Sequence, residues 1–192
     1  MILASKSPRR KEIMESFGFN LEIITPDIEE VSDEIKIVDQ IMDIARKKAL
    51  DVSKNFKSDY ILAADTVVVL DNKVFGKPKD KSEAKEMLKL LSNRTHEVIT
   101  AYCLLNMDKK VEVVSHDITK VKFKDLTEEI IEWYLSTGEP FDKAGSYGIQ
   151  GKGALLIENI DGDFFSVMGL PIERIVSDLL NIGLKLDELN TL

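Results

Sequence analysis

The stretch of residues 60–70 most constrains the fold of this chain, because it is almost continuously apolar and rich in β-branched side chains. A run of this kind predicts a central β-strand that is buried on both faces. One acidic residue, Asp65, stands in the middle of the run. The fold must therefore cover this strand on both sides and still provide for a carboxylate within it.

Helical periodicity and strand-like runs alternate along the rest of the chain. Apolar residues recur at helical spacing over 38–56, and Ser7, Asp80 and Thr127 stand where the N-caps of other helices are expected. Pro171 is placed to open a last helix that ends near residue 182. Further strands are predicted at residues 2–4, 21–24, 96–107, 111–123, 154–160 and 163–168, with a hairpin partner that ends near residue 75. We predict an α/β fold, in which helices flank a mixed β-sheet.

The chain has 192 residues, of which 44% are hydrophobic and 31% charged, as in ordinary globular proteins. This length suits a single domain over residues 1–192, or two small lobes around a cleft. No apolar run approaches the ~20 residues that a membrane helix needs. The early cations Lys6, Arg9 and Arg10 are not typical of a signal peptide. We therefore expect no membrane partner.

Cysteine and histidine are scarce in this sequence. Cys103 is its only cysteine, which excludes an internal disulfide and a zinc site built from cysteines. The two histidines, His96 and His116, leave little for a histidine-built metal centre. Such usage is typical of a reducing compartment, and we expect the protein in the cytoplasm.

The formal net charge is −8, so the surface repels a phosphate backbone and nucleic acid is not expected as a partner. Residues 5–11 reverse this sign locally, with four cations and no acid. Ser7, Arg9 and Arg10 lie here between a predicted strand and a helix N-terminus, where backbone N–H groups and guanidinium groups favour phosphate. The alternative is an ordinary capped helix with solvated charges.

Asp65 is the most informative single residue. An unpaired carboxylate within an apolar strand is costly, so it needs a cation, hydrogen bonds or a metal. It is a candidate general base or metal ligand, and the alternative is a structural aspartate at a strand edge or bulge. Glu30, in an acidic loop, is a candidate to join it around Mg²⁺, although most loop glutamates have no such role.

Two lysines and a glycine-rich loop complete the candidates. Lys77 stands between Gly76 and Pro78, and Lys48 lies late on the second predicted helix, with turn chemistry and a solvated face as the respective alternatives. The loop 138–153 has glycines at 145, 148 and 151, which allow a ligand to approach the backbone. Gln150 in this loop offers a donor and an acceptor for a base edge, and a tight structural loop is the alternative. His96, at a strand border, is expected to pack or cap.

Taken together and in order, these segments resemble the Maf family of nucleoside triphosphate pyrophosphatases. The resemblance implies an α/β fold similar to inosine triphosphate pyrophosphatase, a homodimer, and a divalent cation such as Mg²⁺ or Mn²⁺. It also implies hydrolysis of a nucleoside triphosphate to the monophosphate and pyrophosphate. The matching segments are residues 5–10, 64–67, 76–78, 91–100, 138–151 and 169–171.

Within that family, Arg9, Thr66 and Gln150 match the branch that acts on dTTP and UTP, and Asp65 matches the family's proton acceptor. Departures at residues 93 and 101–102 lie outside the expected site. Our hypothesis is that Asp65 accepts the proton of the attacking water or, with Glu30, holds the metal ion. Five residues are expected to neutralise the charge of the triphosphate, and Thr66 and Gln150 are expected to select the base. The five phosphate residues are Ser7, Arg9, Arg10, Lys48 and Lys77. Two alternatives stay open: a nucleotide-binding regulator of cell division without significant turnover, and a monophosphatase.

Overall fold

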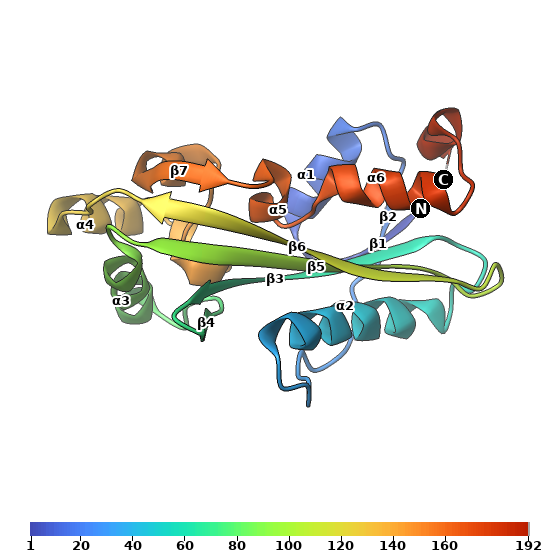
Figure 1. Ribbon diagram of the computed structural model, residues 1–192, viewed down its shortest axis with the longest axis horizontal. Helices are drawn as coiled ribbons and strands as arrows, with labels where there is room; N and C mark the ends of the chain where they lie inside the picture. Colours follow the sequence, from blue (N-terminus) through green and yellow to red (C-terminus); the bar gives the residue numbers. More distant parts are fainter. Residues whose placement is uncertain (192) are drawn as a thin grey trace. The chain divides into compact units, whose positions relative to one another are not determined.

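The computed structural model describes residues 1–191 (Figure 1). Its strands form one seven-stranded sheet in the order β2-β1-β3-β5-β6-β7, with β4 paired to β3. The strands are β1 (Ile2–Ala4), β2 (Glu22–Ile23), β3 (Ile61–Leu70), β4 (Lys73–Phe75), β5 (Thr95–Asn106), β6 (Val111–Phe123) and β7 (Ile157–Asp161). β1 runs parallel to β2 and β3, whereas β4 and β7 run antiparallel to their partners. The predicted α/β fold with a mixed sheet is confirmed.

The helices begin where the sequence places their caps. Ser7 caps α1, Asp80 accepts a hydrogen bond from the N–H of Glu83 at the start of α3, and Thr127 caps α4. None of the described helices is long and apolar enough to cross a membrane. The α-helices are α1 (Pro8–Ser16), α2 (Ile37–Ser53), α3 (Lys81–Leu91), α4 (Glu128–Ser136), α5 (Phe164–Met168) and α6 (Ile172–Asn181). The 3-10 helices are η1 (Glu139–Asp142), η2 (Ala144–Ser146), η3 (Gly151–Leu156) and η4 (Leu186–Thr191).

The chain divides into two compact units. The first unit holds residues 1–65, 100–117 and 169–192, and the second holds residues 66–99 and 118–168. In the first unit, α2 lies on one face of the strands, and α1 and α6 lie on the other (Figure 1). The boundary passes through β3, so this strand gives Asp65 to the first unit and Thr66 to the second.

The register of β1 on β3 positions the candidate site. Ile2 pairs with Ile61 and Ala4 with Ala63, so Ser5 follows β1 at the level where Ala64 and Asp65 follow on β3. Residues 61–64 and 68–70 of β3 are buried, whereas residues 65–67 between them are only partly buried. The strand predicted to be buried on both faces is therefore partly open at Asp65.

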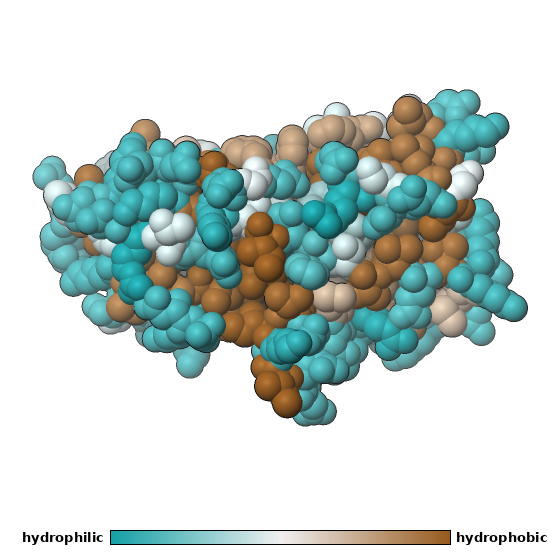
Figure 2. All heavy atoms as spheres, in the orientation of Figure 1, coloured by the Kyte–Doolittle hydropathy of each residue, from teal (hydrophilic) through white to brown (hydrophobic). Residues whose placement is uncertain are grey.

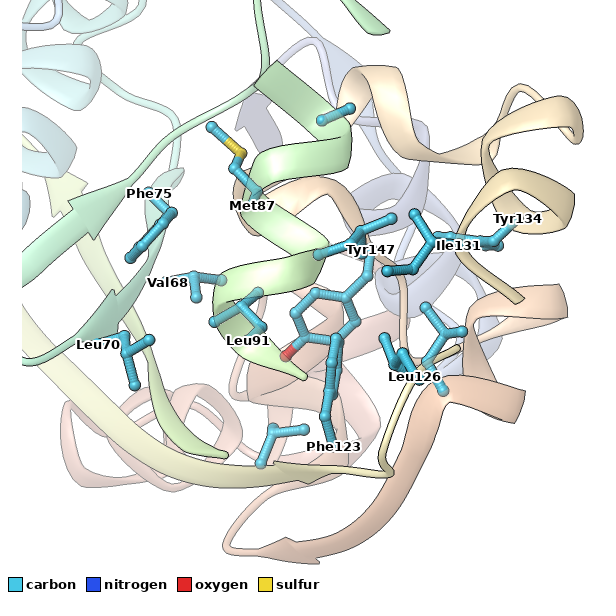
Figure 3. Packing of buried hydrophobic residues seen from close by; sticks show 14 of the residues in the cluster. Val68, Leu70, Phe75, Met87, Leu91, Phe123, Leu126, Ile131, Tyr134 and Tyr147 are labelled. Atoms are coloured by element: carbon cyan, nitrogen blue, oxygen red, sulfur yellow. The ribbon is translucent and has the colours of Figure 1, made fainter. Parts of the chain in front are cut away.

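The core of the second unit lies under α3 and α4 (Figure 3). It joins apolar side chains of β3, β4 and β6 to those of the two helices and of the glycine-rich loop. Tyr147 of that loop lies beside Phe123 of β6 in this core. The loop is thus anchored in the interior of its unit.

One predicted strand is wrong. Residues 163–168 were expected to be extended, but Phe164–Met168 form the short helix α5. Asp163 accounts for the difference, because its carboxylate accepts a hydrogen bond from the N–H of Phe165 and its carbonyl accepts one from Val167. A short and mostly apolar segment such as residues 164–168 does not by itself distinguish a strand from a helical turn. The strand predicted at 154–160 is shortened, since η3 extends to Leu156.

Candidate active site

The carboxylate of Asp65 lies beside the ammonium of Lys48. Asp65 Oδ1 and Lys48 Nζ are 2.8 Å apart, and the same Nζ lies 2.8 Å from Glu30 Oε1. The Lys48 side chain is 7% exposed and that of Asp65 is 14% exposed, whereas Glu30 is 62% exposed. A single ammonium thus joins a carboxylate in the sheet to a carboxylate in a surface loop.

The apolar face of α2 carries Lys48 into this position. Its buried residues include Ile41, Ala45 and Val52, which share one face of the helix with Lys48 at helical spacing. The sequence alternative, a solvated lysine, is wrong. The apolar stem covers the core while the ammonium reaches the carboxylate, which offsets the cost of burying the charge.

The loop that bears Glu30 leads into α2 and is exposed. Figure 2 shows a hydrophobic projection below α2, and Val31 and Ile35 of this loop are both exposed. Lys47 donates a hydrogen bond to the carbonyl of Val31, and Ser32 donates one to Asp43. Gln40 of α2 also donates to the carbonyl of Glu34, so α2 holds the loop at several points beyond the Lys48–Glu30 contact.

The segment after β1 forms a corner around Arg10. The Nε of Arg10 donates to the carbonyl of Gly169 at 2.8 Å, and an Nη donates to the carbonyl of Ala64 at 2.9 Å. The same Nη lies 3.3 Å from the Oγ of Ser5. Because Ala64 precedes Asp65, these bonds fix Arg10 next to the candidate carboxylate.

Two opposing effects act on the charge of Arg10 in this corner. Burial lowers the pKa of the Arg10 guanidinium from its usual value, and the Asp65 carboxylate acts in the opposite direction. A guanidinium stays protonated in proteins even so. Arg10 is therefore a permanent positive charge beside Asp65. Ser7 caps α1, and Arg9 follows in its first turn, where the helix dipole favours an anion.

Three of the candidates belong to the second unit: Thr66, Lys77 and Gln150. Lys77 and Gln150 are exposed, and Thr66 is partly buried. The N–H of Gly145 donates to the carbonyl of Gly76 at 3.0 Å, which ties the glycine-rich loop to the turn that presents Lys77. Their predicted placement around the triphosphate with the first-unit residues stays a prediction.

Close backbone approach explains two glycines of the loop. A Cβ on Gly145, whose φ is +66°, would lie 2.8 Å from a methyl group of Val68. A Cβ on Gly153 would lie 2.1 Å from the carbonyl oxygen of Gly148. Neither position has space for a larger residue. The alternative of a tight structural loop is thus correct for part of this segment.

Two contacts could not be found from the sequence. Gly169 belongs to one of the segments that carry the family resemblance, yet no sequence pattern indicates that its carbonyl holds Arg10. His96 was expected to pack or cap, and it does pack, but its Nε2 also lies 2.7 Å from the hydroxyl oxygen of Tyr147. A buried histidine and a tyrosine far apart in sequence reveal such a pair only once the fold is known.

The acidic residues allow a limited metal site. Among the described residues no cluster of three or more histidine, cysteine or acidic side chains could hold a metal ion. Glu30 and Asp65 nevertheless direct two carboxylate oxygens at one cation, the Lys48 ammonium. Oxygen donors of this kind suit Mg²⁺, which keeps water and substrate phosphate as its other ligands. The residues present therefore fit a divalent cation.

Comparisons with known proteins agree with this picture. A family model described as "Maf-like protein" matches residues 1–182. The chain is 50% identical over 186 residues to a dTTP/UTP pyrophosphatase of Fusobacterium nucleatum subsp. nucleatum, covering 97% of each chain. It is also 50% identical to proteins of the same name from Pyrococcus furiosus, over 97% of this chain and 96% of the relative, and Clostridioides difficile, over 94% and 93%.

Proposed function

Since the chain belongs to the Maf-like protein family, we propose that it hydrolyses dTTP and UTP to the monophosphate and pyrophosphate. The relatives that are half identical over nearly the whole chain carry this activity in their names, which confirms the enzyme predicted from the sequence. The observation that supports the catalytic assignment is the partly buried Asp65 carboxylate, held between Lys48 and the Arg10 corner. Residues 1–192 act as one Maf-like domain in this proposal.

Asp65 accepts the proton of the attacking water in this mechanism. The water oxygen forms a bond to the α-phosphorus, and the bond from that phosphorus to the bridging oxygen of the β-phosphate breaks. An aspartate can act as general base only while ionised and within reach of the water. The Lys48 ammonium lies 2.8 Å from the Asp65 carboxylate, and the partial exposure of Asp65 supports access of water.

Glu30 and Asp65 would hold the divalent cation, Mg²⁺ or Mn²⁺. When bound, such an ion supplies positive charge to the phosphates and makes a coordinated water more acidic. The two carboxylates now contact the Lys48 ammonium. With a divalent cation in its place, the ammonium would be released from both carboxylates and could turn toward the triphosphate. Glu30 and Asp65 are the two metal ligands that the sequence predicts.

Five residues neutralise the triphosphate charge as it shifts toward the leaving pyrophosphate. Arg10 is the best fixed of them, because two backbone carbonyls orient its guanidinium. The N-terminus of α1 adds a positive dipole end beside Ser7 and Arg9. The five are Ser7, Arg9, Arg10, Lys48 and Lys77.

Thr66 and Gln150 select the pyrimidine base. Gln150 can donate and accept one hydrogen bond each, which suits the imide edge of uracil or thymine. Rates of pyrophosphate release from a panel of triphosphates test this assignment, and we expect much higher rates with dTTP and UTP than with GTP.

The replacement Asp65→Asn tests the mechanism. It keeps the shape of the side chain and removes the base, so pyrophosphate release from UTP should fall by about a hundredfold or more. Asp71→Asn is the matched control, because Asp71 directly follows the same strand and pairs with Arg94 on the surface. Comparable turnover in Asp65→Asn would refute the role of Asp65.

The product distinguishes the alternatives. Orthophosphate as the only product would indicate a monophosphatase. Stabilisation by UTP without any pyrophosphate release would indicate a regulator that binds nucleotides. Separation of pyrophosphate from orthophosphate after incubation with Mg²⁺ and UTP decides between them.

We also propose a homodimer in the cytoplasm. The free and buried Cys103 is in keeping with a reducing compartment. Sedimentation of the purified protein measures the oligomeric state.

A further inference from the structure

We infer that His96 and Tyr147 are positioning residues for the nucleotide site: their contact fixes the glycine-rich loop that presents Gln150 and holds the Lys77 turn. This inference rests on the proposed function of Gln150 and Lys77. All four residues belong to the second unit, and the argument uses contacts within that unit alone.

The two side chains meet in the interior. His96 is 2% exposed and Tyr147 is 4% exposed, and the Nε2–Oη distance is 2.7 Å. Phe123 packs edge-on against both, with ring centroids 5.0 Å from His96 and 4.6 Å from Tyr147. Figure 3 shows the Tyr147 ring beside Phe123, with Leu91 close by. Three rings that pack edge to face leave each side chain little freedom to move.

The direction of the hydrogen bond follows from the surroundings. Burial lowers the pKa of His96 to about 4, so the imidazole is neutral near pH 7 and has one N–H and one acceptor nitrogen. In the part of the chain that the structure describes, Nδ1 has no hydrogen-bond partner. If the Tyr147 hydroxyl donates to Nε2, the Nδ1–H is the one group of the pair left without a partner. If Nε2–H donated to Tyr147 instead, both Nδ1 and the tyrosine O–H would lack a partner. Tyr147 is therefore the donor.

A buried donor without a partner calls for an explanation beyond packing, because an apolar residue would avoid the unsatisfied group. The polar pair supplies what an apolar pair lacks: a directional tether that fixes the distance and orientation of Tyr147. Tyr147 is also the loop residue that enters the core cluster between Gly145 and Gly148.

Gly145 connects the Tyr147 backbone to the turn that precedes Lys77. Two residues before Tyr147, the N–H of Gly145 donates to the carbonyl of Gly76, which directly precedes Lys77. Gly145 also lies against Val68, with no space for a Cβ. A displacement of Tyr147 therefore moves the backbone that holds the turn before Lys77.

On its C-terminal side, the Tyr147 backbone leads to Gln150. The N–H of Gly148, next to Tyr147, donates to the hydroxyl of Tyr134 at 3.1 Å. Gln150 follows two residues later and is exposed, so its side chain depends on this backbone for its position. Fixing Tyr147 thus fixes the start of the segment that ends in Gln150.

The test combines Tyr147→Phe with the double variant Tyr147→Phe/His96→Leu. Tyr147→Phe should raise KM for UTP about five- to tenfold, lower the preference for UTP over GTP, and change kcat by less than about twofold. It should also lower the thermal midpoint. The double variant removes both polar partners, so its thermal midpoint should recover while KM stays high.

Tyr102→Phe is the matched control. Tyr102 is also a buried tyrosine whose hydroxyl donates a hydrogen bond, to Asp178, but it belongs to the first unit, whereas the glycine-rich loop belongs to the second. It should lower the thermal midpoint and leave KM unchanged. Unchanged KM and base preference in Tyr147→Phe would overturn the inference, as would a KM that recovers together with stability in the double variant.

Equilibrium titration of each variant with UTP separates this inference from the proposed function. If the wild-type protein binds UTP but releases no pyrophosphate, the proposed function fails, and a raised Kd in Tyr147→Phe still supports the tether. If the wild-type protein binds no UTP, both fail.

Discussion

The candidate residues of the first unit and those of the second unit are held in place by different forces. In the first unit, charged groups and backbone carbonyls surround Arg10 and Lys48, and each charge has a partner within hydrogen-bond distance. In the second unit, neutral aromatic rings and glycines without space for a side chain hold the loop. The comparison indicates that the first region tolerates no loss of charge, and the second tolerates no change of shape.

Lys48→Met breaks the first region and should have the largest effect. It leaves the Asp65 carboxylate without its ammonium and removes one positive charge from the proposed phosphate site. The kcat/KM for UTP should fall about a hundredfold or more. Lys54→Met is the control, since Lys54 stands at the end of the same helix and pairs with Asp51 at the surface. A Lys48→Met enzyme with ordinary kcat/KM would contradict the electrostatic account of this region.

Acidification tests the neutral character of the second region. The folded pKa of His96 is about 4 and lies below the unfolded value of about 6.5, so the unfolded chain binds the proton first. The stability that His96 contributes above pH 6.5 is therefore lost as the pH falls from 6.5 toward 4, by about 3 kcal/mol at most.

The double variant Tyr147→Phe/His96→Leu lacks this titrating group and should lose less free energy of unfolding over the same range. Urea unfolding at pH 7 and pH 5 measures the difference. Equal losses in the two proteins would show that His96 is not a buried neutral group.

Of the three changes discussed here, Gly145→Ala should have the smallest effect. It tests how far the stability of the second unit depends on the space available at this glycine. A Cβ here meets Val68 at 2.8 Å in a backbone with φ of +66°, so the free energy of unfolding should fall by about 2 kcal/mol. Gly183→Ala separates the causes, because Gly183 has φ of +96° but open space around it. Its loss should be about 1 kcal/mol. Equal losses would leave no part for the Val68 contact.

Much of the fold could be predicted because its signals are local. The helix caps Ser7, Asp80 and Thr127 each accept a hydrogen bond from the backbone N–H three positions later, so the sequence indicates where these helices begin. The strand around Asp65 is equally clear from composition, and its carboxylate needed a cation, hydrogen bonds or a metal in any fold.

The features that could not be predicted depend on contacts between distant segments. The burial of Lys48 depends on which face of α2 meets the sheet, and a lysine within an apolar periodicity is usually solvated. The carbonyl of Gly169 and the hydroxyl of Tyr147 find their partners only through the tertiary fold. The helix at Phe164–Met168 differs from a strand by a single local cap at Asp163.

The corner around Arg10 has a consequence for the order in which parts of the protein form during synthesis. Arg10 lies near the start of the chain, but one of the carbonyls that orient it belongs to Gly169, which is 159 positions further on. A ribosome adds residues from the N-terminus onward, so a growing chain contains Arg10 long before it contains this acceptor. The cationic corner is thus among the last parts to be completed during synthesis, and a prematurely terminated chain would lack it.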